Sequence, residues 1–98
     1  GDDAKAAVPD LTALLKDKDE QVRASAAAGL GEVGPAAKAA VPALAAALKD
    51  RDAEVRLNAA AALGAVGPAA RAGEKALADC LKDEDEGVRG QAAESLGK

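Results

Sequence analysis

Apolar residues recur along the chain at intervals of three and four, in two kinds of run that alternate down its length. This spacing places apolar side chains on one face of an α-helix. The runs that show it best are Val8, Leu11 and Leu15; Val41, Leu44, Ala45 and Leu48; and Val55, Ala59, Ala62, Leu63 and Val66. No segment alternates with a period of two, and Ile is absent, so the pattern predicts an all-α protein.

Proline, aspartate and glycine mark the predicted helix boundaries. Pro9 and Pro42 lie near the start of the first kind of run, so a helix begins or is kinked there. Gly34 and Gly67 follow the second kind of run, where we expect left-handed C′ residues, each with a proline after it that prevents the helix from continuing. The expected N-caps of the second helices are Asp19, Asp52 and Asp85.

The two runs together form a unit that occurs three times. Blocks beginning at Gly1, Gly34 and Gly67 align without gaps at a spacing of 33 residues, giving repeats 1–33, 34–66 and 67–98. One helix pair of this size cannot bury its apolar stripe alone, so neighbouring pairs must stack and share a core. We therefore predict a single domain over 1–98, an α-α superhelix of three helix pairs, and a segment of a longer array.

Composition limits the chemistry. Hydrophobic residues make up 49% of the chain, yet it has no Phe, Trp, Tyr, Met or His and a single Cys, so its core must be thin. The absence of His removes the commonest general base and metal ligand, and one Cys excludes an internal disulfide. A net charge of −4 without aromatic residues disfavours nucleic acid and anionic membranes. We expect no cofactor, no metal and no membrane span. The absence of Met suggests an excised or engineered segment, and a cytoplasmic location is favoured.

Three local motifs have architectural interpretations. The G-x-G-x-x-G match at 29–34 closes a predicted helix instead of following a strand, which favours a glycine cap over a dinucleotide site. The acidic run at 82–87 has Gly87 one position too early for a calcium loop. Cys80 occupies the position of Leu14 and Ala47, so a small buried apolar residue is expected there and a reactive thiol is the alternative.

Charged residues also recur at fixed repeat positions. A recurring arginine could mark an anion site, but it more naturally bridges an aspartate or a helix-end carbonyl of the neighbouring repeat. We therefore expect a structural ladder built from Asp17, Asp19, Arg23, Asp50, Asp52, Arg56, Asp83, Asp85 and Arg89.

The copies differ mainly on one face of the second helix, opposite the apolar stripe. Variation beside a constant framework is typical of a recognition surface, and equally of any solvated face. Leu57 is the large apolar residue of the set and the best candidate anchor. The candidate protein-binding residues are Gln21, Ala24, Ser25, Ala28, Glu54, Leu57, Asn58, Ala61, Gln91 and Glu94.

The stretch VPALAAALKDRDAEVRLNAAAALGAVG resembles the HEAT-like repeats of the phycobilisome-lyase type, and the resemblance covers the whole chain. It implies an α-solenoid with first helices on the convex side, second helices lining the concave side, and a protein-binding role. Two related enzyme groups are not matched. Deoxyhypusine hydroxylase uses His-Glu pairs, and His is absent here; bilin lyases bind a large tetrapyrrole, for which no aromatic contacts are present.

These observations favour a non-catalytic protein-protein interaction scaffold that uses the second-helix face. Two alternatives stay open: an engineered or excised repeat module with no specific partner, and a fragment of a bilin-lyase-like enzyme. The partner is a protein of unknown identity. Weak end-to-end self-association is also expected, because Leu11, Leu14 and Leu15 have no preceding repeat to cover them.

Overall fold

The computed structural model describes residues 2–98, apart from the side chains of residues 2, 3 and 69. Gly1, the predicted start of the first repeat, lies outside the described residues. The chain is an all-α solenoid. The α-helices are α1 (Asp2–Ala6), α2 (Val8–Leu14), α3 (Glu20–Val33), α4 (Val41–Ala47), α5 (Ala53–Val66), α6 (Glu74–Asp79) and α7 (Glu86–Leu96). The 3₁₀ segments are η1 (Gly34–Ala40), η2 (Gly67–Gly73) and η3 (Cys80–Lys82).

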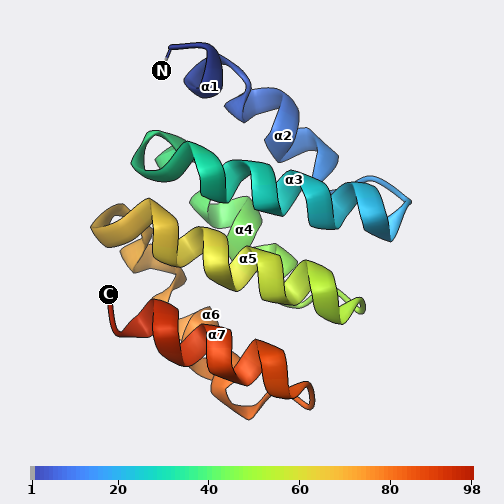
Figure 1. The fold of residues 1–98 in the computed structure, drawn as a ribbon, viewed down its shortest axis with the longest axis vertical. Coiled ribbons are helices and arrows are strands. Elements are labelled where there is room, and N and C mark those ends of the chain that lie inside the picture. Colours follow the sequence, from blue (N-terminus) through green and yellow to red (C-terminus); the bar gives the residue numbers. More distant parts are fainter. Residues whose placement is uncertain (1) are drawn as a thin grey trace.

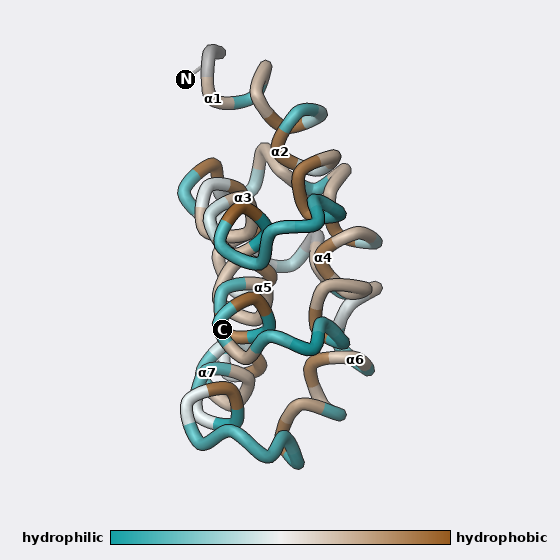
Figure 2. Tube along the Cα trace, turned by 90° about the vertical axis from the view of Figure 1, so that its right-hand side faces the viewer, coloured by the Kyte–Doolittle hydropathy of each residue, from teal (hydrophilic) through white to brown (hydrophobic). Residues whose placement is uncertain are grey.

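The helices form two layers. Helices α3, α5 and α7 lie side by side in the front layer of Figure 1, and the shorter α2, α4 and α6 form the other layer, as the turned view shows (Figure 2). The first helix pair is at one end of the stack and the last pair at the other (Figure 1). Helix α3 packs on α5 and α5 on α7, and each long helix also packs on its own short partner.

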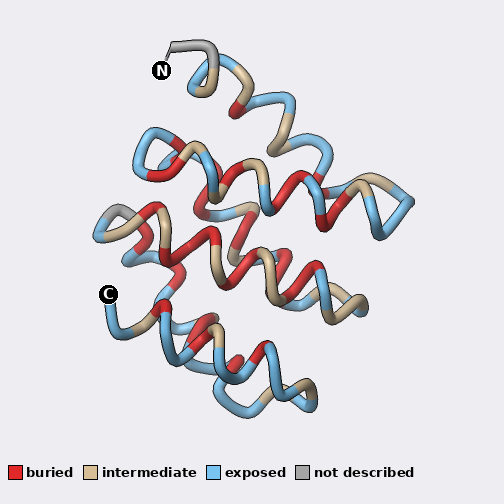
Figure 3. Tube along the Cα trace, viewed as in Figure 1, coloured by how far each residue is buried: buried red, intermediate tan, exposed pale blue. Residues whose placement is uncertain are grey.

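Small side chains fill the space between the layers, and the buried positions run through the middle of the stack (Figure 3). Ala27, Ala59, Ala60 and Ala92 are fully buried. The largest fully buried side chains are only Leu30, Leu44, Leu63, Val55, Val66 and Val88. The helices approach closely: a Cβ built on Gly31 would lie 3.3 Å from the Cα of Ala62. A core of this kind needs no aromatic side chain because the helix backbones are already near one another.

The predicted helix boundaries are confirmed at the aspartates and at the first-helix prolines. Asp19 accepts a hydrogen bond from the N–H of Gln21, Asp52 from Glu54 and Val55, and Asp85 from Val88. Pro9 and Pro42 occupy the first turn of α2 and α4, where a missing N–H costs nothing.

The prediction for the glycines after the second helices needs correction. Gly34 and Gly67 have positive φ values of 72° and 83°, but their ψ values of −140° and −147° lie outside the left-handed helical region. As expected, α3 and α5 do not continue past these glycines. Pro35 and Pro68 lie in the first turn of η1 and η2, because the first positions of any helix tolerate proline. The chain therefore turns at each glycine and resumes at once as a 3₁₀ segment.

The expected exposure of the first helix is correct only in part. Leu14 is 40% exposed, but Leu15 is 6% exposed and belongs to the core. Leu11 is half-buried, with its Cδ2 3.3 Å from the position of a Cβ built on Gly29. Helix α2 packs directly on α3, so its own partner covers two of the three leucines without any preceding repeat.

Candidate interaction surface

Ion pairs join each repeat to the next. Nε of Arg23 lies 2.7 Å from Oδ2 of Asp50, and its Nη2 donates to Oδ1 at 3.2 Å. Arg56 forms the same bidentate contact with Asp83: its Nε lies 2.9 Å from Oδ2, and its Nη2 donates to Oδ1 at 3.1 Å. Each arginine thus binds an aspartate 27 residues later in the chain. We call these contacts the Arg–Asp ladder.

The same side chains also hold the turns between the paired helices. Nη1 of Arg23 donates to the carbonyl of Asp17 at 2.7 Å, and Nη1 of Arg56 donates to that of Asp50 at 2.8 Å. The carboxylates of Asp50 and Asp83 each accept a further bond from the backbone N–H two residues on. Every ladder contact therefore joins two neighbouring helix pairs and fixes the turn of both.

Hydrogen bonding and burial set the charge state of the ladder. Hydrogen bonds from Arg56 lower the pKa of Asp83, against a smaller effect of burial. Burial acts to raise the pKa of Asp50, but the hydrogen bonds from Arg23 and from the turn outweigh it, and the net pKa is lowered. The hydrogen bonds that the two arginines donate to Asp50 and Asp83 raise the pKa of both Arg23 and Arg56. Since the guanidinium groups of Arg23 and Arg56 are occupied, the geometry supports an architectural role and not an anion site.

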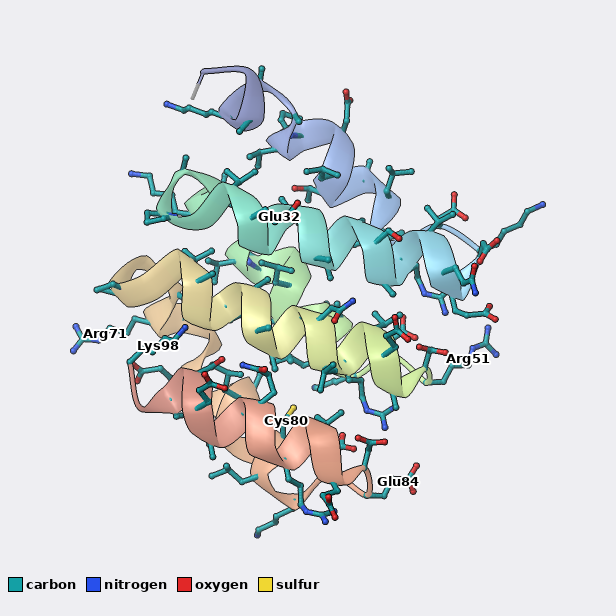
Figure 4. All side chains as sticks on the ribbon, in the orientation of Figure 1. Glu32, Arg51, Arg71, Cys80, Glu84 and Lys98 are labelled. Carbon is teal, nitrogen blue, oxygen red and sulfur yellow. The ribbon has the colours of Figure 1, made fainter. Side chains whose placement is uncertain are left out.

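The other polar motifs are also part of the architecture. Asp83 and Asp85, the aspartates of the acidic run, are engaged with Arg56 and with backbone N–H groups. The described part of the chain holds no cluster of three or more potential metal ligands. Cys80 (labelled in Figure 4) is buried, and burial raises the pKa of its thiol. A raised pKa disfavours the thiolate, so the thiol packs as an apolar group.

The candidate protein-binding residues do not share one environment. Gln21, Ser25, Ala28, Glu54 and Glu94 are exposed, and Leu57, Asn58, Ala61 and Gln91 are half-buried. Ala24 is only 5% exposed, which contradicts its place on a solvated face. The reason is that α5 packs over this part of α3.

Two polar side chains hold neighbouring long helices together. Nδ2 of Asn58 donates to the carbonyl of Ala24 at 3.0 Å, and Oγ of Ser95 donates to the carbonyl of Ala60 at 2.7 Å. From the sequence, Asn58 was placed on the variable face and Ser95 among the polar residues expected to cap the last helix, but Ser95 is buried against α5. Neither contact has a sequence signal, because the acceptor is a backbone carbonyl more than thirty residues away.

Two shallow grooves run between neighbouring long helices. The groove between α3 and α5, which we call the alanine groove, is lined by Ala28, Gly31, Glu32, Asn58, Ala61, Ala62 and Ala65. A second groove between α5 and α7 holds Leu57, next to Glu54 and Gly87. Sequence reasoning found Ala28, Ala61 and Leu57 but missed the other small residues, because they also repeat as part of the packing framework.

Acidic side chains dominate the exposed surface of the long helices. The long helices carry the exposed side chains of Glu20, Glu32, Glu54, Glu86 and Glu94 and contain no lysine. Two of their three arginines, Arg23 and Arg56, are buried in the ladder. Exposed cations such as Lys38 and Lys75 lie in the other layer. Glu32 is labelled on α3 in Figure 4, and Arg51 extends away from the molecule at the turn before α5. The long-helix face is therefore acidic, a feature that the near-balanced composition conceals.

Stacked helix pairs with a shared core, a repeated internal ladder and one extended open face define an α-solenoid. The comparison with family models gives the particular family. The model for HEAT repeats matches residues 41–98, and the model for a single HEAT repeat matches residues 7–37. The chain belongs to the HEAT repeat family. HEAT repeats generally mediate protein-protein interactions and are generally non-catalytic.

No curated protein matches the chain. Within the described residues, none of the helices has the length and apolar character needed to cross a membrane.

Proposed function

We propose that this chain is a non-catalytic scaffold that binds a protein partner on the open face of α3, α5 and α7. The observation that supports this most directly is the alanine groove. It is an apolar strip, open to solvent, between two helices whose relative position is fixed by the ladder and by Asn58. A rigid groove of small residues admits a partner's backbone or short side chains at close range. That this face is concave stays a prediction.

The charge of the face indicates the chemistry of the partner. Exposed glutamates lie along the long helices, including Glu32 at the groove itself. Complementary potentials speed association and suppress wrong partners. We therefore propose a partner segment that combines lysine or arginine with small apolar side chains.

Leu57 would contribute the apolar anchor next to the groove. It is half-buried against the core and lies between Glu54 and Gly87. Because a Cβ on Gly87 would lie 3.3 Å from Cδ1 of Leu57, glycine at this position leaves the leucine uncovered on that side. Small interface residues contribute little individually, so we expect modest affinity from this segment alone.

A direct test selects binding peptides from a random display library with the immobilised chain and maps them by amide NMR. We expect the selected peptides to be enriched in lysine, arginine and small apolar residues. Their shift changes should concentrate at Ser25, Ala28, Leu57 and Ala61. Filling the groove with Ala61→Arg should weaken binding about tenfold or more, since it adds both bulk and like charge toward a basic peptide.

Ala46→Arg is the matched control, because Ala46 is an exposed alanine of α4 in the other layer. It should leave binding unchanged. Shift changes confined to α4 and α6, or equal losses in the two variants, would contradict the proposed face.

We also propose the phycobilisome-lyase subtype within the HEAT repeats, supported by the short 33-residue period and the LKDxDxxVR sequence at each turn. The proposal concerns repeat type and not lyase activity. A linear tetrapyrrole titrated into the chain should show no spectral change. A stoichiometric absorbance shift would instead favour the enzyme-fragment alternative.

A further inference from the structure

The Arg–Asp ladder ends in an open arginine at the last helix pair. Arg89 occupies the position of Arg23 and Arg56 and makes the same bond to its own turn, from Nη1 to the carbonyl of Asp83 at 2.7 Å. Arg23 and Arg56 are each 8% exposed, whereas Arg89 is exposed. Among the side chains that the structure describes, no carboxylate forms an ion pair with Arg89. The guanidinium is therefore already oriented by its turn and lacks only the next aspartate.

The surface around Arg89 is an uncovered copy of the interface between repeats. Ala27 and Ala60, which are fully buried, correspond to Ala93, which is exposed. In the short-helix layer, Leu48 is 3% exposed, while its equivalent Leu81 is 44% exposed. The C-terminal end thus presents the side of a repeat that elsewhere is covered by a following repeat.

The N-terminal end presents the opposite side of the same interface. Asp17 occupies the ladder position of Asp50 and Asp83 and already accepts the N–H of Asp19 at 2.9 Å, as its equivalents accept theirs. Among the described residues, no arginine or lysine forms an ion pair with it. Leu14 is 40% exposed, although its equivalents Ala47 and Cys80 are 8% and 5% exposed. Both exposed large apolar side chains, Leu14 and Leu81, therefore lie at interface positions, one at each end.

We propose that the C-terminal end of one copy of this chain binds the N-terminal end of a second copy. Arg89 of one copy forms an ion pair with Asp17 of the next copy. Leu81 and Leu14 are buried at the same junction. Charge complementarity and the two internal junctions support this occupant, since Arg23–Asp50 and Arg56–Asp83 already show the same contact within one chain. The binding is head-to-tail, so it leaves a free end on each copy and extends with concentration.

This junction is separate from the open face of the long helices. A partner bound at the alanine groove leaves both ends free, so the two proposals succeed or fail independently. The junction is also weaker than the internal ones, because forming it between separate copies costs translational and rotational entropy.

Charge-swapped variants of the 98-residue chain test the contact. We expect the average mass of the wild type to rise with concentration in sedimentation or light-scattering measurements at low salt. Arg89→Asp and Asp17→Arg should each weaken self-association more than tenfold, because each places like charges opposite one another. A mixture of the two variants should assemble again, since Asp at 89 then meets Arg at 17 and the native pair forms at the alternate junctions.

Arg51→Asp is the matched control, because it makes the same charge change at an exposed arginine of the middle repeat. It should associate like the wild type. Leu81→Asn gives a second probe that leaves the ladder turns intact, and it should also weaken association. Circular dichroism checks that each variant is folded.

A wild type that stays monomeric at millimolar concentration would overturn the proposal. Self-association that is unchanged in Arg89→Asp, or a mixture that stays monomeric when both variants are folded, would also overturn it.

Discussion

At the scale of single residues, the carboxylates of Asp50 and Asp83 each accept several hydrogen bonds at once. Each accepts a bond from its own turn and a two-pronged contact from the arginine of the preceding repeat. That arginine also donates to the carbonyl of its own turn. Turn geometry and repeat stacking are therefore coupled, and a change in one aspartate affects both.

Acid should weaken this coupling. The pKa of Asp83 is lowered in the folded chain, mainly by hydrogen bonds from Arg56. Its contribution to stability is therefore fully present above the ordinary aspartate pKa and is lost as pH falls from about 4 through the lower folded value. We expect Asp83→Asn to unfold more easily than the wild type at pH 7 and to show a flatter loss of stability below about pH 4.

Urea unfolding across a pH series measures this effect. Asp79→Asn is the control, because Asp79 is exposed on α6 and takes no part in the ladder. If the free energy of unfolding falls equally steeply below about pH 4 in Asp83→Asn and in the wild type, the ladder is not the source of this pH dependence.

At the scale of secondary-structure elements, glycines decide how closely the long helices approach. A Cβ on Gly64 would lie 2.5 Å from Oγ and 3.2 Å from Cα of Ser95, so α7 crosses α5 at this point. Gly31 has the same role where α3 meets Ala62 of α5. Gly90, also within a long helix, meets nothing within 4 Å.

These contacts predict opposite outcomes for the same substitution. Gly64→Ala should lower the free energy of unfolding by about 1–3 kcal/mol, because α7 must move away and strain the Ser95 bond. Gly90→Ala should raise it by up to about 1 kcal/mol, because alanine favours the helix and meets no neighbour. Thermal and urea unfolding at low protein concentration distinguish them, and equal effects would contradict the close crossing at Gly64.

At the scale of the whole molecule, stability is distributed along a line of nearest-neighbour interfaces. Helix α5 packs between α3 and α7, while α3 and α7 each have a long neighbour on one side among the described residues. Repeat stacks of this kind open most readily where a helix pair has fewer neighbours.

Hydrogen exchange should therefore show its strongest protection in α5. We expect protection to decrease toward α7, whose outer face is exposed at Gly90 and Ala93. Self-association through the ends should raise the protection of α7 as the concentration increases. Stronger protection in α7 than in α5 at low concentration would contradict a stack stabilised mainly by its neighbours.

By itself the sequence determined what depends on local spacing. Apolar residues every three or four positions specified the helices, Asp19, Asp52 and Asp85 capped them, and the 33-residue period specified a stack of pairs. These features can be predicted from the sequence, because caps and helical faces depend on residues within a turn or two of one another. The ladder positions were visible for the same reason, since they obey the period.

Tertiary structure alone decided which faces are covered and what the open one presents. Ala24 is buried and Asn58 is tied to its carbonyl, although both read as variable surface positions, and Leu15 is covered by its own helix pair. The tertiary structure also brought the exposed glutamates of the long helices onto one acidic face. These properties depend on a neighbouring helix about 33 residues away, and the burial of a residue is set by that neighbour and not by its own segment.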